Sequence, residues 1–241
     1  MDQHEKAGLL RSLHRGPGIL VLPNAWDVAS AKRLAAVPGV RALATTSAAV
    51  ARSLGWEDGE QAPRDEMVEA ARRIAAAVDI PVTADLEAGY GDPVGTAQRA
   101  WEAGVVGLNF EDSPGDVLMP VEEQVALIRA IREAVPELVI NARVDVFVNG
   151  DGNVDEAVGR ANAYLAAGAD CTYPILCPPD AVAELARRID GPINVLLIER
   201  GMPGPSELEA LGVARVTWGS GLGAIAYKAA VATVEAAVSG G

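Results

Sequence analysis

Two acidic residues, Asp85 and Glu87, stand two positions apart at the end of an apolar run in the sequence VTADLEAGYG. Residues i and i+2 of a β-strand point to the same face, so we expect both carboxylates to project together from one strand end. Gly89 and Gly91 follow at once and let the chain turn in backbone conformations that side chains disfavour. Neighbouring carboxylates repel each other unless a cation lies between them, and Mg²⁺ or Mn²⁺ prefers oxygen ligands. The spacing indicates a divalent-metal site, and the alternative is a solvated strand-to-helix turn that carries acids without a ligand.

These acids belong to a regular succession of apolar strands and amphipathic helices. Strands are predicted over residues 18–25, 42–47, 82–87, 107–112, 139–147, 171–175, 193–198 and 215–221. Glycine ends several of the predicted helices just before the next strand, as in EAGVVGLNF and AAGADCTYP. Eight alternating units predict a single α/β domain over residues 1–241, a (β/α)8 TIM-type barrel with an added N-terminal helix. A doubly wound open sheet would require GxGxxG after its first strand, and the sequence has none there.

Composition and charge narrow the class of partner. The chain has 241 residues and a formal net charge of −13, which repels nucleic acid and anionic membrane surfaces. The N-terminus has no continuous apolar segment typical of a signal peptide, and no later run reaches the eighteen or so uncharged residues of a membrane span. Both histidines, His4 and His14, fall in the predicted N-terminal helix, which argues against a Ser-His or Cys-His catalytic pair. We therefore expect a cytoplasmic protein that binds neither nucleic acid nor membrane.

A third acid and an arginine end the next two predicted strands. Glu111 would neighbour Asp85 and Glu87, because the carboxyl ends of barrel strands meet at one rim. Three carboxylates in one corner require a counter-charge, and Mg²⁺ or Mn²⁺ would supply it. Arg143 on the following strand could grip a substrate carboxylate or phosphonate with two parallel hydrogen bonds. The alternative is that Arg143 forms a structural salt bridge with Glu111 or Asp145.

Six segments occur together in a characteristic order: PNAWDVASA, TTSAAVARSLGWEDGE, ADLEAGYG, GLNFED, INARVDVF and PINVLL. In order and spacing, over residues 18–221, they resemble the isocitrate lyase and phosphoenolpyruvate mutase superfamily. The resemblance implies an α/β barrel that binds Mg²⁺ through Asp85, Glu87 and Glu111, directly or through water. The family usually has aspartate where Glu87 stands, so the longer side chain departs from its pattern.

The resemblance also implies roles for residues outside the acidic cluster. Asp58 lies in the long predicted loop over residues 50–63 and matches an acid on the family's mobile loop, which makes it the candidate acid or base. Arg143 matches the arginine that grips the substrate. The remaining implied substrate-binding residues are Thr46, Ser47, Ala48 and Asn194, although the family often has glycine at the position of Ala48.

The chemistry common to the resembling enzymes is an enolate stabilised by the metal while a neighbouring bond breaks. Lyases for isocitrate and methylisocitrate resemble one another in a KKCGH-like sequence after the fourth strand, whereas the loop here reads DSPGDVLMP. That loop also lacks the basic groups suited to a phosphoryl group. We therefore predict a Mg²⁺-dependent lyase that cleaves a C–C bond of a small 2-oxo or 2-hydroxy (di)carboxylate, such as an oxaloacetate decarboxylase or hydrolase or a methylmalate-type lyase. The alternatives are a phosphoenolpyruvate mutase or phosphonopyruvate hydrolase, and a non-catalytic barrel that binds a small acid.

The last predicted helix, GAIAYKAAVATVEAAVSG, is apolar nearly all round, with Lys228 and Glu235 as its charged residues. Such a helix needs burial on more than one side, and the outer ring of a barrel offers one. We expect a homo-oligomer, a dimer or a tetramer, in which this helix packs on a neighbour. The resemblance implies the same, because family members exchange this helix between subunits. The alternative is an alanine-rich helix in solvent.

Overall fold

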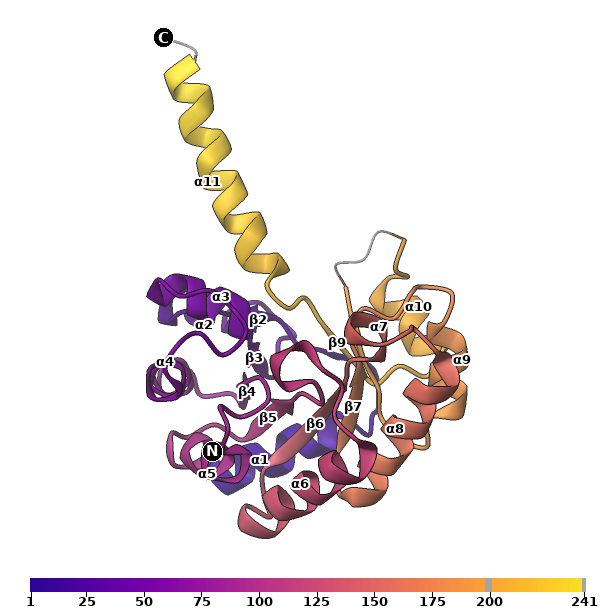
Figure 1. Cartoon of the computed structure of the whole chain (residues 1–241). Coiled ribbons are helices and arrows are strands. Elements are labelled where there is room, and N and C mark those ends of the chain that lie inside the picture. The colour runs from indigo at the N-terminus through magenta and orange to yellow at the C-terminus, as the bar shows by residue number, and fades with distance from the viewer. Residues whose placement is uncertain (198–200, 240–241) are drawn as a thin grey trace.

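A ring of parallel strands lies at the centre of the computed structural model, which describes residues 1–197 and 201–239 (Figure 1). The strands are two to six residues long, and their side chains are almost all buried. They are β1 (Leu20–Val21), β2 (Asn24–Ala25), β3 (Leu43–Thr45), β4 (Val82–Asp85), β5 (Gly107–Phe110), β6 (Val139–Val144), β7 (Cys171–Pro174), β8 (Asn194–Leu196) and β9 (Arg215–Thr217).

The ring consists of two parallel sheets. Strands β2 to β7 form one sheet in chain order, and β1, β9 and β8 form the other. A bridge between Thr172 and Ile193 joins β7 to β8, and the chain itself joins β1 to β2. Pro23 separates β1 from β2, since proline has no N–H for a ladder, so these two pieces make one barrel strand. The predicted TIM-type barrel is thereby confirmed.

The Asn24 side chain fastens the two sheets together at the rim of the barrel. Its amide nitrogen donates to the carbonyl oxygen of Thr45, after which β3 ends, at 2.8 Å. Its amide oxygen accepts the backbone N–H of Trp218, just beyond β9, also at 2.8 Å. Asn24 is buried, so both hydrogen bonds are shielded from water.

Amphipathic helices surround the ring (Figure 1). Their starts follow ordinary capping rules; for example, Pro93 stands in the first turn of α5, and the Asp92 side chain accepts the N–H of Gly95. The apolar faces of the helices pack on the strands in one continuous core. The helices of this ring are α2 (Val28–Ala35), α4 (Arg64–Ala76), α5 (Pro93–Glu102), α6 (Val121–Ala134), α8 (Val154–Ala167), α9 (Val182–Arg188) and α10 (Pro205–Ala210).

The predicted N-terminal helix is α1 (Gln3–Leu13), which covers one end of the barrel. Ala7, Leu10 and Leu13 form a second apolar cluster with residues from the amino-terminal ends of the strands, such as Val106 and Val139. With that end closed, the carboxyl ends of the strands provide the accessible mouth.

Three short helices lie where the sequence pattern predicts a loop or a strand. Helix α3 (Ser47–Leu54) begins at the last residue of the predicted strand 42–47 and includes the first five residues of the predicted loop 50–63, because its small residues bury one face and Gly55 ends it in a left-handed conformation. Strand β6 ends at Val144, so the predicted extension to residue 147 is wrong; α7 (Val146–Asn149) follows instead. A 3₁₀ turn, η1 (Pro114–Asp116), lies in the loop after β5. The predicted strand 193–198 is described to Leu196, and residue 198 lies outside the described residues.

The last helix, α11 (Gly221–Ser239), projects away from the barrel (Figure 1). Gly223 is its buried residue, while Ile225 and Val234 are 63 % and 62 % exposed. By length and composition this helix could also cross a membrane, since its two charges do not prevent it from meeting that criterion. The fold thus leaves a long apolar surface uncovered by its own chain.

Candidate active site

A pocket of about 260 Å³ opens at the carboxyl ends of the barrel strands. Side chains from both sheets and from the connecting loops line it, and most of the predicted site residues are among them. The lining residues are Asn24, Thr46, Ser47, Ala48, Asp58, Asp85, Asn109, Arg143, Val148, Tyr173, Ile175, Leu176, Leu196, Thr217, Gly219 and Ser220.

Asp85 ends β4 and faces this pocket. Its Oδ2 accepts the backbone N–H of Ser47 at 3.1 Å, at the amino-terminal end of α3, where the helix dipole favours negative charge. Its Oδ1 is buried and has no hydrogen-bond partner in the described part of the chain. Burial raises the pKa of Asp85, while the Arg143 guanidinium acts in the opposite direction. A buried carboxylate oxygen without a donor is suited to a cation.

Glu87 points elsewhere, because its backbone adopts a left-handed conformation with φ of 54°. Its carboxylate accepts the N–H of Glu60 at 2.6 Å and the Tyr90 hydroxyl at 2.8 Å. The side chain is 4 % exposed, and burial raises the pKa of Glu87 to about 7. Glu87 therefore fastens the loop that carries Asp58 to the turn after β4, and it is not among the pocket's lining residues.

Arg143 ends up between two carboxylates. It pairs with Glu111 through Nη1, and its Nε donates to Asp145 Oδ1 at 2.6 Å. Burial alone would lower the pKa of Arg143, but Glu111 and Asp145 together raise it. Glu111 is itself largely buried, and this burial raises its pKa well above the ordinary value. Arg143 thus forms the salt bridges with Glu111 and Asp145 that were the alternative to substrate binding, and it also lines the pocket.

The three predicted metal acids do not form a preassembled cage. Among residues 1–197 and 201–239, no group of three or more His, Cys, Asp or Glu side chains converges on a point where an ion could bind. Mg²⁺ commonly uses one or two protein carboxylates together with water and substrate oxygens. Asp85, with its unpartnered Oδ1, fits that pattern as the direct ligand. Metal-binding roles for Glu87 and Glu111 remain predictions.

The other predicted substrate residues divide into two groups. Thr46, Ser47 and Ala48 line the pocket at the start of α3, and Asp58 lines it from an exposed loop at its lip. Asn194 is completely buried and is not among the pocket's lining residues, so its substrate-binding role remains a prediction. Its amide donates to Thr217 Oγ1 at 3.1 Å, and Thr217 reaches the pocket.

Several lining residues are not predicted from the sequence pattern, notably Asn109, Tyr173 and Thr217. Asn109 stands two residues before Glu111, so it shares the face of that strand one layer deeper in the barrel. Counting back two residues from Glu111, the acid at the strand end, would have identified Asn109 in the sequence.

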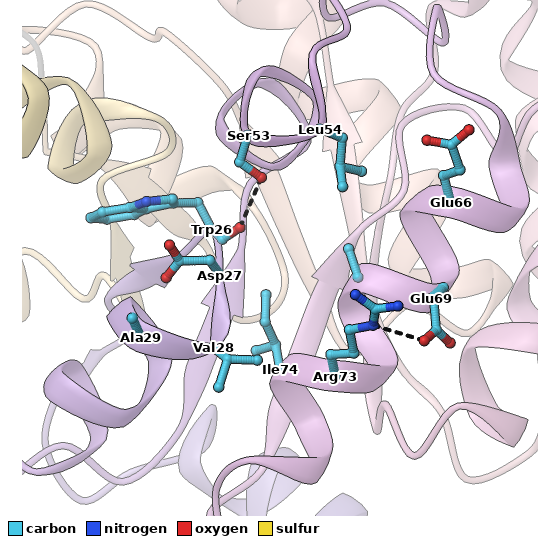
Figure 2. Close-up of a pocket in the computed structure, with 11 residues that line it drawn as sticks. Trp26, Asp27, Val28, Ala29, Ser53, Leu54, Glu66, Glu69, Arg73 and Ile74 are labelled. Atoms are coloured by element: carbon cyan, nitrogen blue, oxygen red, sulfur yellow. Dashed lines mark hydrogen bonds and ion pairs between the residues drawn. The ribbon is translucent and has the colours of Figure 1, made fainter.

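A second, larger pocket of about 470 Å³ lies on the outer face, between α2, α3 and α4 (Figure 2). Trp26, Val28 and Ile74 contribute apolar surface there, and Arg73 pairs with Glu69 at its edge, at 2.8 Å. None of Asp58, Asp85 or Arg143 lines this pocket. Its size does not make it the better candidate, because it lies between helices on the outside of the barrel, whereas barrel enzymes carry their chemistry at the mouth.

A barrel with its acids at the carboxyl ends of the strands defines a class of enzymes, and comparisons with known proteins specify the family. The family model for phosphoenolpyruvate phosphomutase matches residues 10–238. The 2-methylisocitrate lyase of Bacillus subtilis (strain 168) is 32 % identical over 213 residues, which covers 83 % of this chain and 70 % of that protein.

Solved structures agree with the family model. One from Burkholderia cenocepacia J2315, provisionally named a phosphonomutase, has a TM-score of 0.89 and 40 % identity, and covers 96 % of this chain and 99 % of its own. A 2,3-dimethylmalate lyase has a TM-score of 0.83 and 26 % identity, over 98 % and 88 % of the two chains. The chain belongs to the phosphoenolpyruvate phosphomutase family, within the superfamily that also contains isocitrate lyase. Its relatives at 26 % identity or more include lyases and a phosphoenolpyruvate phosphomutase.

Proposed function

We propose that this protein is a Mg²⁺-dependent lyase that cleaves a C–C bond in a small 2-oxo or 2-hydroxy (di)carboxylate. The observation that carries the proposal is that Asp85, with an unpartnered buried oxygen, and Arg143 line the same pocket. Its volume of about 260 Å³ is below the roughly 300–1,000 Å³ of pockets for drug-sized ligands, which favours a substrate of few atoms.

The residues around the pocket divide the work of binding and proton transfer. The amino-terminal end of α3, from Thr46 to Ala48, lines the pocket and can hold a carboxylate with the backbone N–H groups that remain available, since the Ser47 N–H donates to Asp85. Arg143 places positive charge along one side of the pocket, and Asp58 at the pocket entrance can donate or accept a proton. Mg²⁺ held at Asp85 would act as a Lewis acid toward substrate oxygens that gain negative charge.

The loop after β5 favours carbon chemistry over phosphorus chemistry. Residues 113–119 read SPGDVLM and carry no Lys, Arg, His or Cys. A migrating phosphoryl group carries dense negative charge and requires cationic or strongly donating groups around it. Asp116 in this loop is exposed and would repel such a group. C–C cleavage that depends on a metal and a general acid or base makes no such demand on this loop.

A substrate panel tests the proposal. Purified protein is assayed with oxaloacetate, 2,3-dimethylmalate, 2-methylisocitrate, phosphonopyruvate and phosphoenolpyruvate, each with Mg²⁺ and with a chelator. We expect Mg²⁺-dependent turnover of at least one of the first three, and its loss in Asp85→Ala. Turnover of phosphonates alone would assign phosphoryl chemistry instead, and binding of acids without any turnover would indicate a non-catalytic barrel.

We also propose that the protein is a homo-oligomer in which α11 packs on a second copy of the chain. Val231 and Val234 are one helical turn apart, and both are more than half exposed, at 56 % and 62 %. Leaving such a surface in water is unfavourable, at about 25 cal/mol for each Å². Tyr227 contacts the Trp26 ring at a centroid separation of 6.3 Å, so the root of α11 is fixed to the barrel while the rest extends.

The oligomer can be tested by light scattering on size-exclusion chromatography. We expect the wild type to be a dimer or larger, and Val231→Glu combined with Val234→Glu to shift it toward the monomer. Val37→Glu, at a valine that is 50 % exposed elsewhere on the barrel, is the matched control. A monomeric wild type that co-sediments with lipid vesicles would instead assign α11 to a membrane.

A further inference from the structure

A row of side chains crosses the inside of the barrel just below the mouth. In the strand register Asp85 of β4 is paired with Asn109 of β5, and Asn109 is paired with Asn141 of β6. Asp85 and Asn109 both line the candidate active site, and Asn109 is 5 % exposed. The polar row therefore forms part of the pocket floor beside the candidate metal ligand.

Arg215 of β9 approaches this row from the other sheet. Its side chain is completely buried, and its Nη2 donates to Asn109 Oδ1 at 3.3 Å. Within the described residues it makes no ion pair with any carboxylate, and its Nε and Nη1 are buried without a hydrogen-bond partner. A buried guanidinium without a counter-ion destabilises a fold, so this one is unlike the paired Arg143 and Arg160.

The contacts of Asn109 determine which way its amide group faces. A guanidinium can only donate hydrogen bonds, so the amide must present its oxygen to Arg215. Asn141 Nδ2 donates to the same oxygen at 2.8 Å and fixes it further. The Asn109 amide nitrogen is then directed away from Arg215, and it makes no hydrogen bond within the described part of the chain. Because the residue lines the pocket, that nitrogen is an available donor at the pocket floor.

We propose that Asn109 is a substrate-binding residue whose amide N–H donates to a carboxylate oxygen of the substrate, and that Arg215 is the positioning residue that orients it. This inference rests on the proposed function, because it takes the small anionic acid of that proposal as the ligand. A hydrogen-bond donor that itself accepts from a cation is polarised, so its N–H is stronger toward an anion. The uncompensated charge of Arg215 adds a positive potential under the same oxygen.

The arrangement also explains how the pocket can bind two anionic groups of one substrate. Arg143 already serves Glu111 and Asp145, so only part of its charge is available to a ligand. The α3 end can hold one carboxylate near the lip. Asn109 and Arg215 provide a second anion-binding position at the floor, which suits a dicarboxylate more than a monoacid.

Oxalate is a direct probe of this position, since a phosphonopyruvate hydrolase of the same fold has been solved with oxalate and Mg²⁺. Calorimetry in Mg²⁺ buffer at about pH 8 compares oxalate binding by the wild type, Asn109→Asp and Asn109→Leu. Aspartate keeps the acceptor for Arg215 and Asn141 but replaces the donor with a second oxygen. A hydrogen bond to a charged group is worth about tenfold or more in affinity, so we expect both variants to bind oxalate at least about tenfold more weakly. Asn162→Asp on α8, far from the pocket, is the matched control and should bind like the wild type.

Arg215→Met separates positioning from a structural role. Methionine fills similar space without a buried charge, so we expect the melting temperature to stay the same or rise while oxalate affinity falls at least about fivefold. Arg215→Lys should restore part of the affinity, because it retains the charge but loses the planar fork. If Arg215→Met melts lower and still binds oxalate like the wild type, Arg215 is structural and the positioning claim is overturned.

The outcomes distinguish this inference from the proposed function. Wild-type affinity for oxalate in Asn109→Asp and Asn109→Leu would overturn the role of Asn109, whatever the substrate panel shows. Conversely, oxalate binding that depends on Asn109 in a protein without lyase turnover would leave the anion position intact and refute the proposed reaction.

Discussion

Glu87 provides the most quantitative test of the electrostatics of this site. Its carboxylate is buried against Tyr90 and the Glu60 amide, and burial raises its pKa from 4.5 to about 7. An acid with a raised pKa in the folded state binds more protons when folded than when unfolded. The contribution of Glu87 to stability is therefore most favourable below about pH 4.5, becomes less favourable as pH rises through the interval to about 7, and is constant above it.

The size of the effect follows from the shift. One pKa unit corresponds to about 1.4 kcal/mol, so the rise of the Glu87 pKa from 4.5 to about 7 gives an upper value of about 3.5 kcal/mol. Glu87→Gln mimics the protonated acid and removes this term. We expect the variant and the wild type, both in chelator, to differ little near pH 5. Near pH 8 the variant should be more stable by about 1–3 kcal/mol.

Urea unfolding at a series of pH values, followed by circular dichroism, measures this difference. Glu60→Gln is a useful control, because glutamine keeps an oxygen that can accept the Tyr90 N–H while one carboxylate of the same loop is removed. This variant should show the same pH dependence as the wild type. A constant stability difference between wild type and Glu87→Gln from pH 5 to 8 would refute the assignment of a raised pKa to Glu87.

Three further predictions concern the metal, the loop after β5 and the core. Asp85→Asn should weaken Mg²⁺ binding at least about tenfold in calorimetry with little change in melting temperature, and unchanged affinity would contradict its role as ligand. Tyr164→Phe removes the hydroxyl that donates to buried Asp112 at 2.7 Å and should cost about 1–3 kcal/mol in urea unfolding; an unchanged midpoint would show that Asp112 finds another donor. Met67→Ala, in the core under α4, should cost about 2–5 kcal/mol, and a smaller loss would mean that the core collapses around it.

The sequence predicts the barrel well because its evidence is repeated along the chain. Apolar runs, helix-ending glycines and polar strand ends recur in each unit, so one ambiguous element does not change the result. Helix α3 escapes prediction since the run SAAVARSL is short and leads directly out of a strand. The end of β6 is similarly obscured, because Val146 and Phe147 are as compatible with a strand as with the turn of helix that they form.

One pairing in the site, Arg143 with Glu111 or Asp145, is among the alternatives that the sequence offers, whereas the contacts of Glu87 are not. Sequence spacing brings Asp85, Glu87 and Glu111 to one region, but the partner that each carboxylate takes depends on competition among side chains. Glu87 turns to the Glu60 amide because of its left-handed backbone, and Glu111 takes Arg143. The roles of Asn109 and Arg215 are harder to predict. In sequence, a polar residue within a strand that binds a ligand looks the same as one that only forms hydrogen bonds with neighbouring side chains.

The barrel is built from two sheets, so two seams between them reach the mouth of the barrel. Asp85 and Arg143 belong to the six-stranded arc, whereas Thr217 and Ser220 belong to the shorter one or follow it, so an acid held in the pocket touches both. A bound ligand would thus hold the two sheets together at the seam where Asn24 bonds to Thr45 and Trp218. The amide proton at this seam, the Trp218 N–H on Asn24 Oδ1, should then exchange with solvent more slowly when the pocket is filled.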